Sequence, residues 1–242
     1  RGGEVGIELW RSTTITAIEK SRRGFQVSVE RSGQSETVGF DLVVHGAGRV
    51  PELAGLNLDA AAVEWDERGV RVSPHLQSTS NAAVYADWGP GLAAGDAANT
   101  PGMPLTPVAV FEGKVAASNM LKASTTVPDY SGVPTAVFTI PALARVGMLE
   151  QEARDQGIDI DVRYRDTSGW YSNYRIGETT AATKILIDRS TDRIVGAHLL
   201  GPEYGEVVNL IALTMKLNLT TSQLKSMTAA YPTVGSDLSS IL

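Results

Sequence analysis

Two short hydrophobic segments on either side of a polar turn place the strongest constraint on the fold of this chain. The segments cover residues 184–188 and 193–200, and the polar residues 189–192 lie between them. Such a pattern predicts a β-hairpin. After Gly201 and Pro202, apolar side chains recur at helical spacing as far as Met215. The C-terminal half is therefore predicted to be an α+β domain with an antiparallel sheet.

Further elements are predicted in this half from local patterns. Strands are expected over residues 135–139 and 158–164, and a helix over residues 149–156 that Gly157 ends. Thr220 and Thr221 suit the start of a second, shorter helix because a threonine hydroxyl accepts from an unpaired amide of the first turn.

The N-terminal half has a different hydrophobic pattern. Residues 13–44 alternate as half-buried strands do, with a turn at Ser32 and Gly33, which predicts a β-meander. A last short strand at residues 41–44 runs into glycines 46 and 48, where the backbone can pass close to a ligand or to a neighbouring chain. Residues 52–82 are expected to form short connecting strands without a long helix.

A helix is predicted to start near residues 105–107. Thr106 suits the N-cap and Pro107 suits the first helical position, since the N–H that proline lacks would be unpaired there. The apolar stripe of this helix is predicted to contain Val108, Phe111, Val115 and Met120. The polar residues 124–132 that follow, which include proline and glycine, are predicted to be a linker and a domain boundary.

Composition excludes several classes of protein. The chain has 242 residues, 43% of them hydrophobic and 20% charged, with a net charge of −6. These values fit a globular protein and argue against a nucleic-acid partner or a membrane-embedded chain. The absence of cysteine excludes disulfides and thiolate metal sites within these residues and fits a reducing, cytoplasmic compartment. The N-terminus, which lacks methionine, suggests a fragment or a processed product.

Metal binding is not expected either. The three histidines, His45, His75 and His198, are isolated from one another and from carboxylate clusters. Surface positions or hydrogen-bonded strand positions explain them more simply.

One candidate site is visible from the residues alone. Asp96 follows Gly95 at the end of a short hydrophobic run, just before the helix predicted at Thr106. A carboxylate accepts hydrogen bonds from hydroxyl groups, and the amides of a helix N-terminus stabilise an electron-rich oxygen. Together they suit a polar cofactor, although such an aspartate also commonly forms only a turn, and a Thr-Pro pair is commonly only a cap.

Several of these motifs occur in the order found in one family. In order, the motifs are Gly48-Arg-Val-Pro51, Ala93-Ala-Gly-Asp96, Leu105-Thr-Pro-Val-Ala109, Val133-Pro-Thr-Ala-Val-Phe138, Gly147-Met-Leu-Glu150, Ile194-Val-Gly-Ala197 and Tyr231-Pro-Thr233. The chain thus resembles the C-terminal part of the glutathione-reductase-like pyridine nucleotide-disulfide oxidoreductases.

The resemblance implies an α/β and α+β architecture. Residues 1–50 would be the tail of an NAD(P)-binding domain, residues 51–123 the return segment of an FAD-binding domain, residues 124–132 a linker, and residues 133–242 an α+β dimerisation domain with an antiparallel sheet. It also implies a homodimer that uses FAD and NAD(P)H.

The same resemblance suggests which residues contact the cofactors. Asp96 would contact the ribityl or diphosphate region of FAD, and the helix that starts at Thr106, Pro107, Val108 and Ala109 would point its N-terminus at the pyrimidine end of the flavin. Gly48 would lie beside the nicotinamide cofactor, and Arg49 would be structural or close to FAD. Asp87 is a rival to Asp96, because residues 87–92 look inserted relative to the family.

The chain departs from the family at its proton-transfer group. Tyr231 stands where the family has a histidine acid/base, and Ser236 stands where it has the glutamate that orients this histidine. A phenol is a weak general base near neutral pH, so thiol–disulfide exchange is doubtful. Tyr231 is nevertheless the catalytic candidate, and simple packing at a subunit interface is an equal alternative. The Tyr231–Pro232 bond would be cis by the resemblance, which the sequence alone does not establish.

The predicted function is hydride transfer from NAD(P)H to FAD and on to an unidentified small-molecule acceptor, within an enzyme longer than this chain. The 242 residues alone are expected to be inactive. Two alternatives stay open at this point: a dimerisation or binding module without activity of its own, and an inactive paralogue retained for interaction.

Overall fold

The computed structural model describes residues 6–48, 50–85, 88–89, 92–93, 95–122 and 125–242. The chain divides into two compact units, residues 1–49 and residues 50–242, which we call the N-terminal and C-terminal units. No helix among the described residues is both long enough and apolar enough to cross a membrane.

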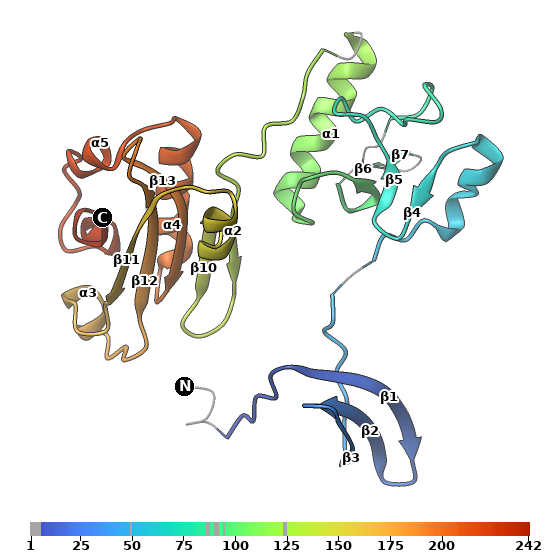
Figure 1. Ribbon diagram of the computed structural model, residues 1–242, viewed down its shortest axis with the longest axis horizontal. Helices are drawn as coiled ribbons and strands as arrows, with labels where there is room; N and C mark the ends of the chain where they lie inside the picture. The colour runs from blue at the N-terminus through green and yellow to red at the C-terminus, as the bar shows by residue number, and fades with distance from the viewer. Residues whose placement is uncertain (1–5, 49, 86–87, 90–91, 94, 123–124) are drawn as a thin grey trace. The chain divides into compact units, whose positions relative to one another are not determined.

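The N-terminal unit is the predicted meander. Its strands are β1 (Thr13–Ser21), β2 (Gly24–Arg31) and β3 (Gln34–Phe40), paired antiparallel in the order β1-β2-β3 (Figure 1). Ser32 and Gly33 both have positive φ in the turn between β2 and β3, as a tight two-residue hairpin requires.

The strand expected at residues 41–44 is not formed, and Leu42 and Val44 are 72% and 82% exposed. A continuous apolar run becomes a strand when neighbouring strands pair with it, and no ladder includes these residues in the described part of this unit.

The first part of the C-terminal unit contains short elements around one long helix. As predicted for residues 52–82, helical structure there is limited to single turns, η2 (Ala54–Leu56) and η3 (Leu58–Ala61). The strands are β4 (Trp65–Asp66), β5 (Gly69–Arg71), β6 (Trp88–Gly89), β7 (Leu92–Ala93) and β8 (Ala98–Asn99), and η4 (Gly95–Ala97) precedes β8. The long helix is α1 (Thr106–Leu121).

Residues 125–130 form neither helix nor strand, yet side chains hold this segment at several points. The side-chain amide of Asn119, on α1, donates to the carbonyl oxygens of His75 and Thr126 at 2.9 and 2.8 Å, and its oxygen accepts from the amide of Thr126 at 2.9 Å. Further along, Lys216 donates to Asp129 at 2.6 Å. The segment predicted to be a linker is thus held by hydrogen bonds to Asn119 and Lys216.

The second part of the C-terminal unit is the predicted α+β domain with an antiparallel sheet. Its five strands lie in the order β11-β12-β13-β10-β9, and all neighbours are antiparallel. The bounds are β9 (Pro134–Val137), β10 (Leu143–Gly147), β11 (Ile160–Asp166), β12 (Ala182–Asp188) and β13 (Arg193–Leu200). The hairpin predicted over residues 184–200 is formed by β12 and β13. Strand β10 was not predicted.

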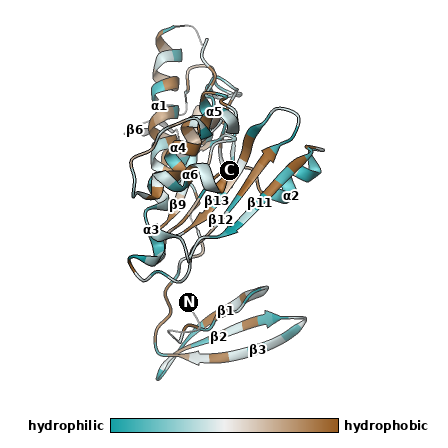
Figure 2. Ribbon diagram, turned by 90° about the vertical axis from the view of Figure 1, so that its left-hand side faces the viewer, coloured by the Kyte–Doolittle hydropathy of each residue, from teal (hydrophilic) through white to brown (hydrophobic). Residues whose placement is uncertain are grey.

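Helices cover this sheet. The long helix α4 (Tyr204–Lys216) packs against β9, β10 and β13, while α2 (Glu150–Asp155) packs near β11. Figure 2 shows hydrophobic residues concentrated along β12 and β13, and hydrophilic residues on α2. Strand β12 contributes to both faces of the sheet, since Ile185 and Ile187 join the core under α4 and Leu186 joins a smaller cluster with Ala153 of α2.

Short helices complete the domain: α3 (Tyr171–Tyr174), α5 (Thr221–Lys225), η5 (Val234–Asp237) and α6 (Leu238–Ile241). Thr220 caps α5 as predicted, because its side chain accepts from the amide of Gln223 at 3.1 Å. Leu149 has no side chain that can cap α2, and the carboxylate of Glu152 instead accepts from the amide of Leu149 at 2.7 Å.

Candidate functional site

The start of α1 is the centre of the candidate cofactor site. The helix begins at Thr106, so its N-cap is Leu105 and the prediction that Thr106 is the N-cap was one residue late. Leu105 has no side-chain oxygen to offer, so this N-cap residue makes no side-chain hydrogen bond to the first turn. In this first turn Thr106 and Val108 carry amides that can face an electron-rich ligand, whereas Pro107 has no N–H and the amide of Ala109 donates to the carbonyl oxygen of Leu105 at 2.9 Å.

Two of the predicted residues at this helix end are exposed and two are buried. Thr106 and Pro107 lie exposed, whereas Val108 and Ala109 are 4% and 6% exposed and fix the helix against its surroundings. Asp96 lies in η4, which packs against α1, and is partly exposed. The loop that carries Asp96 and helix α1 therefore lie together.

The buried face of α1 differs from the predicted stripe. Val108 and Val115 are buried as predicted, but Phe111 and Met120 are 36% and 48% exposed. The other buried positions include two polar residues, Glu112 and Asn119. These residues follow Val108 and Val115 at a spacing of four, so helical periodicity places them on the same face. Polar residues at core positions were a signal that the sequence analysis did not use.

Glu112 is only 1% exposed and is held by two hydroxyl groups. Thr100 and Tyr130 both donate to its Oε1 atom, at 2.7 and 2.6 Å. Burial and the hydrogen bond to Glu112 raise the pKa of Tyr130 well above that of an ordinary tyrosine. This arrangement ties α1 to the loop before it and to the segment after it, and so fixes the axis of the helix.

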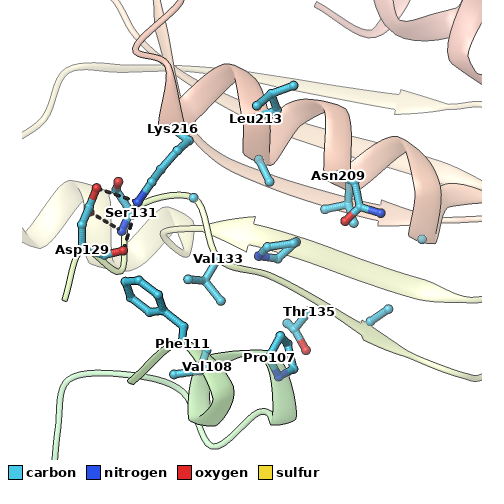
Figure 3. A pocket seen from close by; sticks show the side chains of 16 residues that line it. Pro107, Val108, Phe111, Asp129, Ser131, Val133, Thr135, Asn209, Leu213 and Lys216 are labelled. Carbon is cyan, nitrogen blue, oxygen red and sulfur yellow. Dashed lines mark hydrogen bonds and ion pairs between the residues drawn. The ribbon is translucent and has the colours of Figure 1, made fainter. Parts of the chain in front are cut away.

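A mostly apolar pocket of about 640 Å³ opens beside the N-terminal turn of α1. Figure 3 shows Pro107, Val108 and Phe111 on one wall and Val133 opposite them. At one end of the pocket, Lys216 donates to Asp129, and this hydrogen bond keeps the pKa of Asp129 well below that of an ordinary aspartate. The pocket thus combines apolar walls with one paired cation and one paired anion.

Tyr231, the predicted catalytic residue, lies in the second part of the C-terminal unit and is 78% exposed. Its bond to Pro232 is cis, as is the bond between Ile140 and Pro141. Its ring stacks on that of Tyr171, with centroids 6.4 Å apart and an angle of 23° between the planes. The sequence analysis missed Tyr171, although the run Trp170-Tyr-Ser-Asn-Tyr174 is rich in aromatic residues.

The remaining predicted residues are placed as follows. Gly48 has a φ of +95°, and a Cβ atom there would meet nothing within 4 Å, so its backbone is open to close approach. Arg49 and the rival candidate Asp87 lie outside the described residues.

In the described ranges, no three histidine or acidic side chains are grouped in a way that could hold a metal ion. His198 donates from Nε2 to the carbonyl oxygen of Met148 at 3.1 Å.

Comparison with known proteins shows the family. The profile of the pyridine nucleotide-disulphide oxidoreductase dimerisation domain matches residues 133–240. An uncharacterized 19.7 kDa protein in a mercuric resistance operon of Staphylococcus aureus is 44% identical over 187 residues, which are 77% of this chain and 100% of that protein. This chain belongs to the pyridine nucleotide-disulphide oxidoreductase family, and the predicted resemblance is confirmed.

Longer relatives match almost the whole chain. A mercuric reductase of Staphylococcus aureus is 29% identical over 235 residues, which are 97% of this chain and 41% of that enzyme. The solved Cu(II) complex of the HOCl-induced flavoprotein disulfide reductase RclA from Escherichia coli is 25% identical, with a TM-score of 0.81, over 99% of this chain and 52% of that one. The chain therefore spans about half or less of the length of these enzymes, and the predicted fold class is confirmed.

Proposed function

We propose that this chain supplies the flavin-facing helix and the dimerisation domain of an FAD-dependent NAD(P)H oxidoreductase. In this assignment residues 1–50 are the tail of an NAD(P)-binding domain, residues 51–123 the FAD-domain return segment, residues 124–132 the connection, and residues 133–242 the dimerisation domain. FAD, when bound, supplies the redox chemistry by taking hydride from NAD(P)H and passing electrons to a small-molecule acceptor.

The observation that carries this proposal is the start of α1, a 16-residue helix whose N-cap residue, Leu105, offers no capping side chain and which lies next to the loop of Asp96. The positive end of the helix dipole stabilises negative charge, and reduced flavin is anionic at its pyrimidine end. The residues present therefore fit this group. Most of the family's FAD contacts, including its glycine-rich fingerprint, do not occur in these 242 residues.

Each proposed site residue has a physical task. Asp96 accepts hydrogen bonds from hydroxyl groups of the cofactor, and the first-turn amides of Thr106 and Val108 face its electron-rich oxygen atoms. Pro107 and Ala109 shape this turn, since Pro107 has no N–H and the amide of Ala109 donates to Leu105. Gly48 lets the nicotinamide cofactor approach the backbone closely, and Arg49 has a structural role or contacts FAD. Tyr231 acts across the interface of a homodimer, where its phenol donates a proton or a hydrogen bond.

The test uses the complete polypeptide in which this sequence occurs, purified from cytoplasmic extract. We expect bound FAD, identified after denaturation, and anaerobic bleaching of the visible flavin spectrum by NADH or NADPH. Asp96→Asn is expected to weaken FAD binding about tenfold or more, because a hydrogen bond to a charged group is lost. Asp155→Asn is the matched control, since Asp155 lies exposed on α2 and accepts from Gln151. A colourless protein that neither binds FAD nor oxidises NAD(P)H contradicts the proposal.

A second candidate is a dimerisation or binding module without activity of its own. The 19.7 kDa relative favours it, because the chain covers that short protein completely. Sedimentation of the flavin-free protein separates the two cases: a stable dimer that shows no flavin and no NAD(P)H oxidation supports the module. For a dimer of the family type we expect a total buried area of roughly 2,000 Å² or more.

A further inference from the structure

Tyr171 and Tyr231 form an aromatic pair on the surface of the dimerisation half. Their ring centroids are 6.4 Å apart at an angle of 23° between the planes, which is a stacked geometry. The two side chains remain 56% and 78% exposed, so the pair contributes little buried apolar area. A surface ring usually moves between rotamers, and the stack restricts this freedom for Tyr231.

The residues on both sides of Tyr171 are held in place by packing and by a hydrogen bond. Trp170, just before it, packs against the core under α4. Asn173 is completely buried, and its side chain donates to the carbonyl oxygen of Thr167 at 2.9 Å. The short helix α3 is thus anchored on both sides of Tyr171, and the ring of Tyr171 has a fixed base.

The backbone around Tyr231 is held by hydrogen bonds of residues that follow it in the sequence. Thr233 donates to the carbonyl oxygen of Ala230 at 2.6 Å and accepts from the amide of Ser236 at 3.2 Å. In addition, Ser172 of α3 donates to Asp237 of η5 at 2.5 Å, and Ser172 is 6% exposed. Two contacts therefore join α3 to the segment after Ala230: the ring stack and the Ser172–Asp237 hydrogen bond.

We propose that Tyr171 is a positioning residue that holds the ring of Tyr231 in the orientation needed to donate a proton or a hydrogen bond to the acceptor. The catalytic consequence rests on the proposed function, whereas the orientation of the ring does not. The physical basis is preorganisation: an exposed phenol that is already ordered loses less entropy when it engages a reacting group. Tyr171 touches neither substrate nor cofactor in this scheme and acts through Tyr231.

The test compares variants at Tyr171 in the complete flavin-containing protein. Tyr171→Leu removes the ring at similar volume, Tyr171→Phe keeps the ring and removes the hydroxyl, and Ser172→Ala loosens α3 without touching either ring. Tyr174→Leu is the matched control, because Tyr174 lies on the same helix and is 74% exposed. Thermal melts verify that each variant is folded.

The first readout is NMR of the protein with selectively labelled tyrosine. The Tyr231 ring protons are expected to carry a ring-current shift that Tyr171→Leu abolishes, Ser172→Ala reduces, and Tyr171→Phe and Tyr174→Leu preserve. A Tyr231 resonance that does not move in Tyr171→Leu overturns the proposal, whatever the activity of the protein.

The second readout is NAD(P)H-dependent reduction of menadione, used as the probe acceptor. We expect Tyr171→Leu to lower kcat about three- to tenfold with KM for NAD(P)H unchanged, and Tyr171→Phe to retain the wild-type rate. In Tyr231→Phe the further change Tyr171→Leu is expected to cost nothing more, because the two residues act as one unit. Additive losses, or equal losses in Tyr171→Leu and Tyr174→Leu, overturn the positioning role. A protein without flavin or NAD(P)H oxidation refutes the proposed function instead, and the NMR result then still decides whether Tyr171 orients Tyr231.

Discussion

The hydroxyl of Tyr130 donates a hydrogen bond to Oε1 of Glu112, with 2.6 Å between the two oxygen atoms. Glu112 belongs to α1, whereas Tyr130 belongs to the segment that leads from α1 to the five-stranded sheet. The same carboxyl oxygen accepts from Thr100, so one buried side chain joins three parts of the chain.

Removal of the Tyr130 hydroxyl is expected to destabilise the C-terminal unit. In Tyr130→Phe the buried carboxyl of Glu112 loses one of its donors, and we expect the free energy of unfolding to fall by about 1–3 kcal/mol. Urea denaturation followed by circular dichroism measures this change. Tyr174→Phe removes an exposed hydroxyl and should stay within about 0.5 kcal/mol of the wild type. Equal losses in the two variants would show that the Tyr130–Glu112 contact contributes nothing.

The same contact predicts a pH dependence. The pKa of Tyr130 is raised above its ordinary value of 10.0 by burial and by the hydrogen bond to Glu112. Above about pH 10 the unfolded chain therefore releases this proton while the folded chain keeps it, so stability falls as pH rises. We expect the stability advantage of the wild type over Tyr130→Phe to be constant from pH 7 to 9 and to narrow above pH 10. Denaturation curves of both proteins across this range test the sign, and an advantage that widens above pH 10 would refute it.

Substitution of Asn119 is expected to lower the free energy of unfolding more than substitution of most other polar residues. Its side chain is completely buried and makes three hydrogen bonds with the backbone of His75 and Thr126. Asn119→Ala leaves two carbonyl groups and one amide without these partners, and we expect a loss of about 2–3 kcal/mol. Cleavage between residues 125 and 129 by a non-specific protease should also become faster. Asn209→Ala is the control, because Asn209 is exposed and makes one long hydrogen bond of 3.4 Å to Glu206.

Two glycines should respond to alanine in opposite directions. A Cβ atom on Gly196 of β13 would lie 2.2 Å from the carbonyl oxygen of Met148, so Gly196→Ala must displace backbone and should cost about 2–3 kcal/mol. A Cβ atom on Gly205 of α4 would meet nothing within 4 Å, so Gly205→Ala should add about 0.5–1 kcal/mol through helix propensity. Thermal melts of both variants measure the difference. A stable Gly196→Ala protein would mean that the backbone of β13 and Met148 is less constrained than this contact implies.

Local patterns predicted much of the fold. The β12–β13 hairpin, helix α4 and the cap of α5 by Thr220 all follow from hydrophobic spacing or from the chemistry of one residue next to the helix. The strand expected at residues 41–44 failed because an apolar run becomes a strand only when another strand pairs with it. Strand β10 was missed for the converse reason, since Leu143–Gly147 is short and takes its place from pairing with β9 and β13.

The candidate site was predictable to the extent that it depends on local sequence. The helix start at Thr106 was placed within one residue, and the loop of Asp96 packs against that helix. The contacts of Glu112, Asn119 and Tyr171 were not predicted, because each partner lies elsewhere in the sequence and no periodicity encodes it. A polar residue at a buried helix position indicates only that a partner exists, and the partner is found once the chain is folded.

The fastening of residues 125–130 also bears on how two copies of the chain can associate. Domain swapping requires a hinge that releases one element from its own chain and passes it to another. Here the bonds of Thr126, Asp129 and Tyr130 hold the hinge to α1 on one side and to α4 on the other. Each protomer of a dimer would therefore keep its own helix α1 with its own sheet, and subunits could exchange between dimers only as whole molecules.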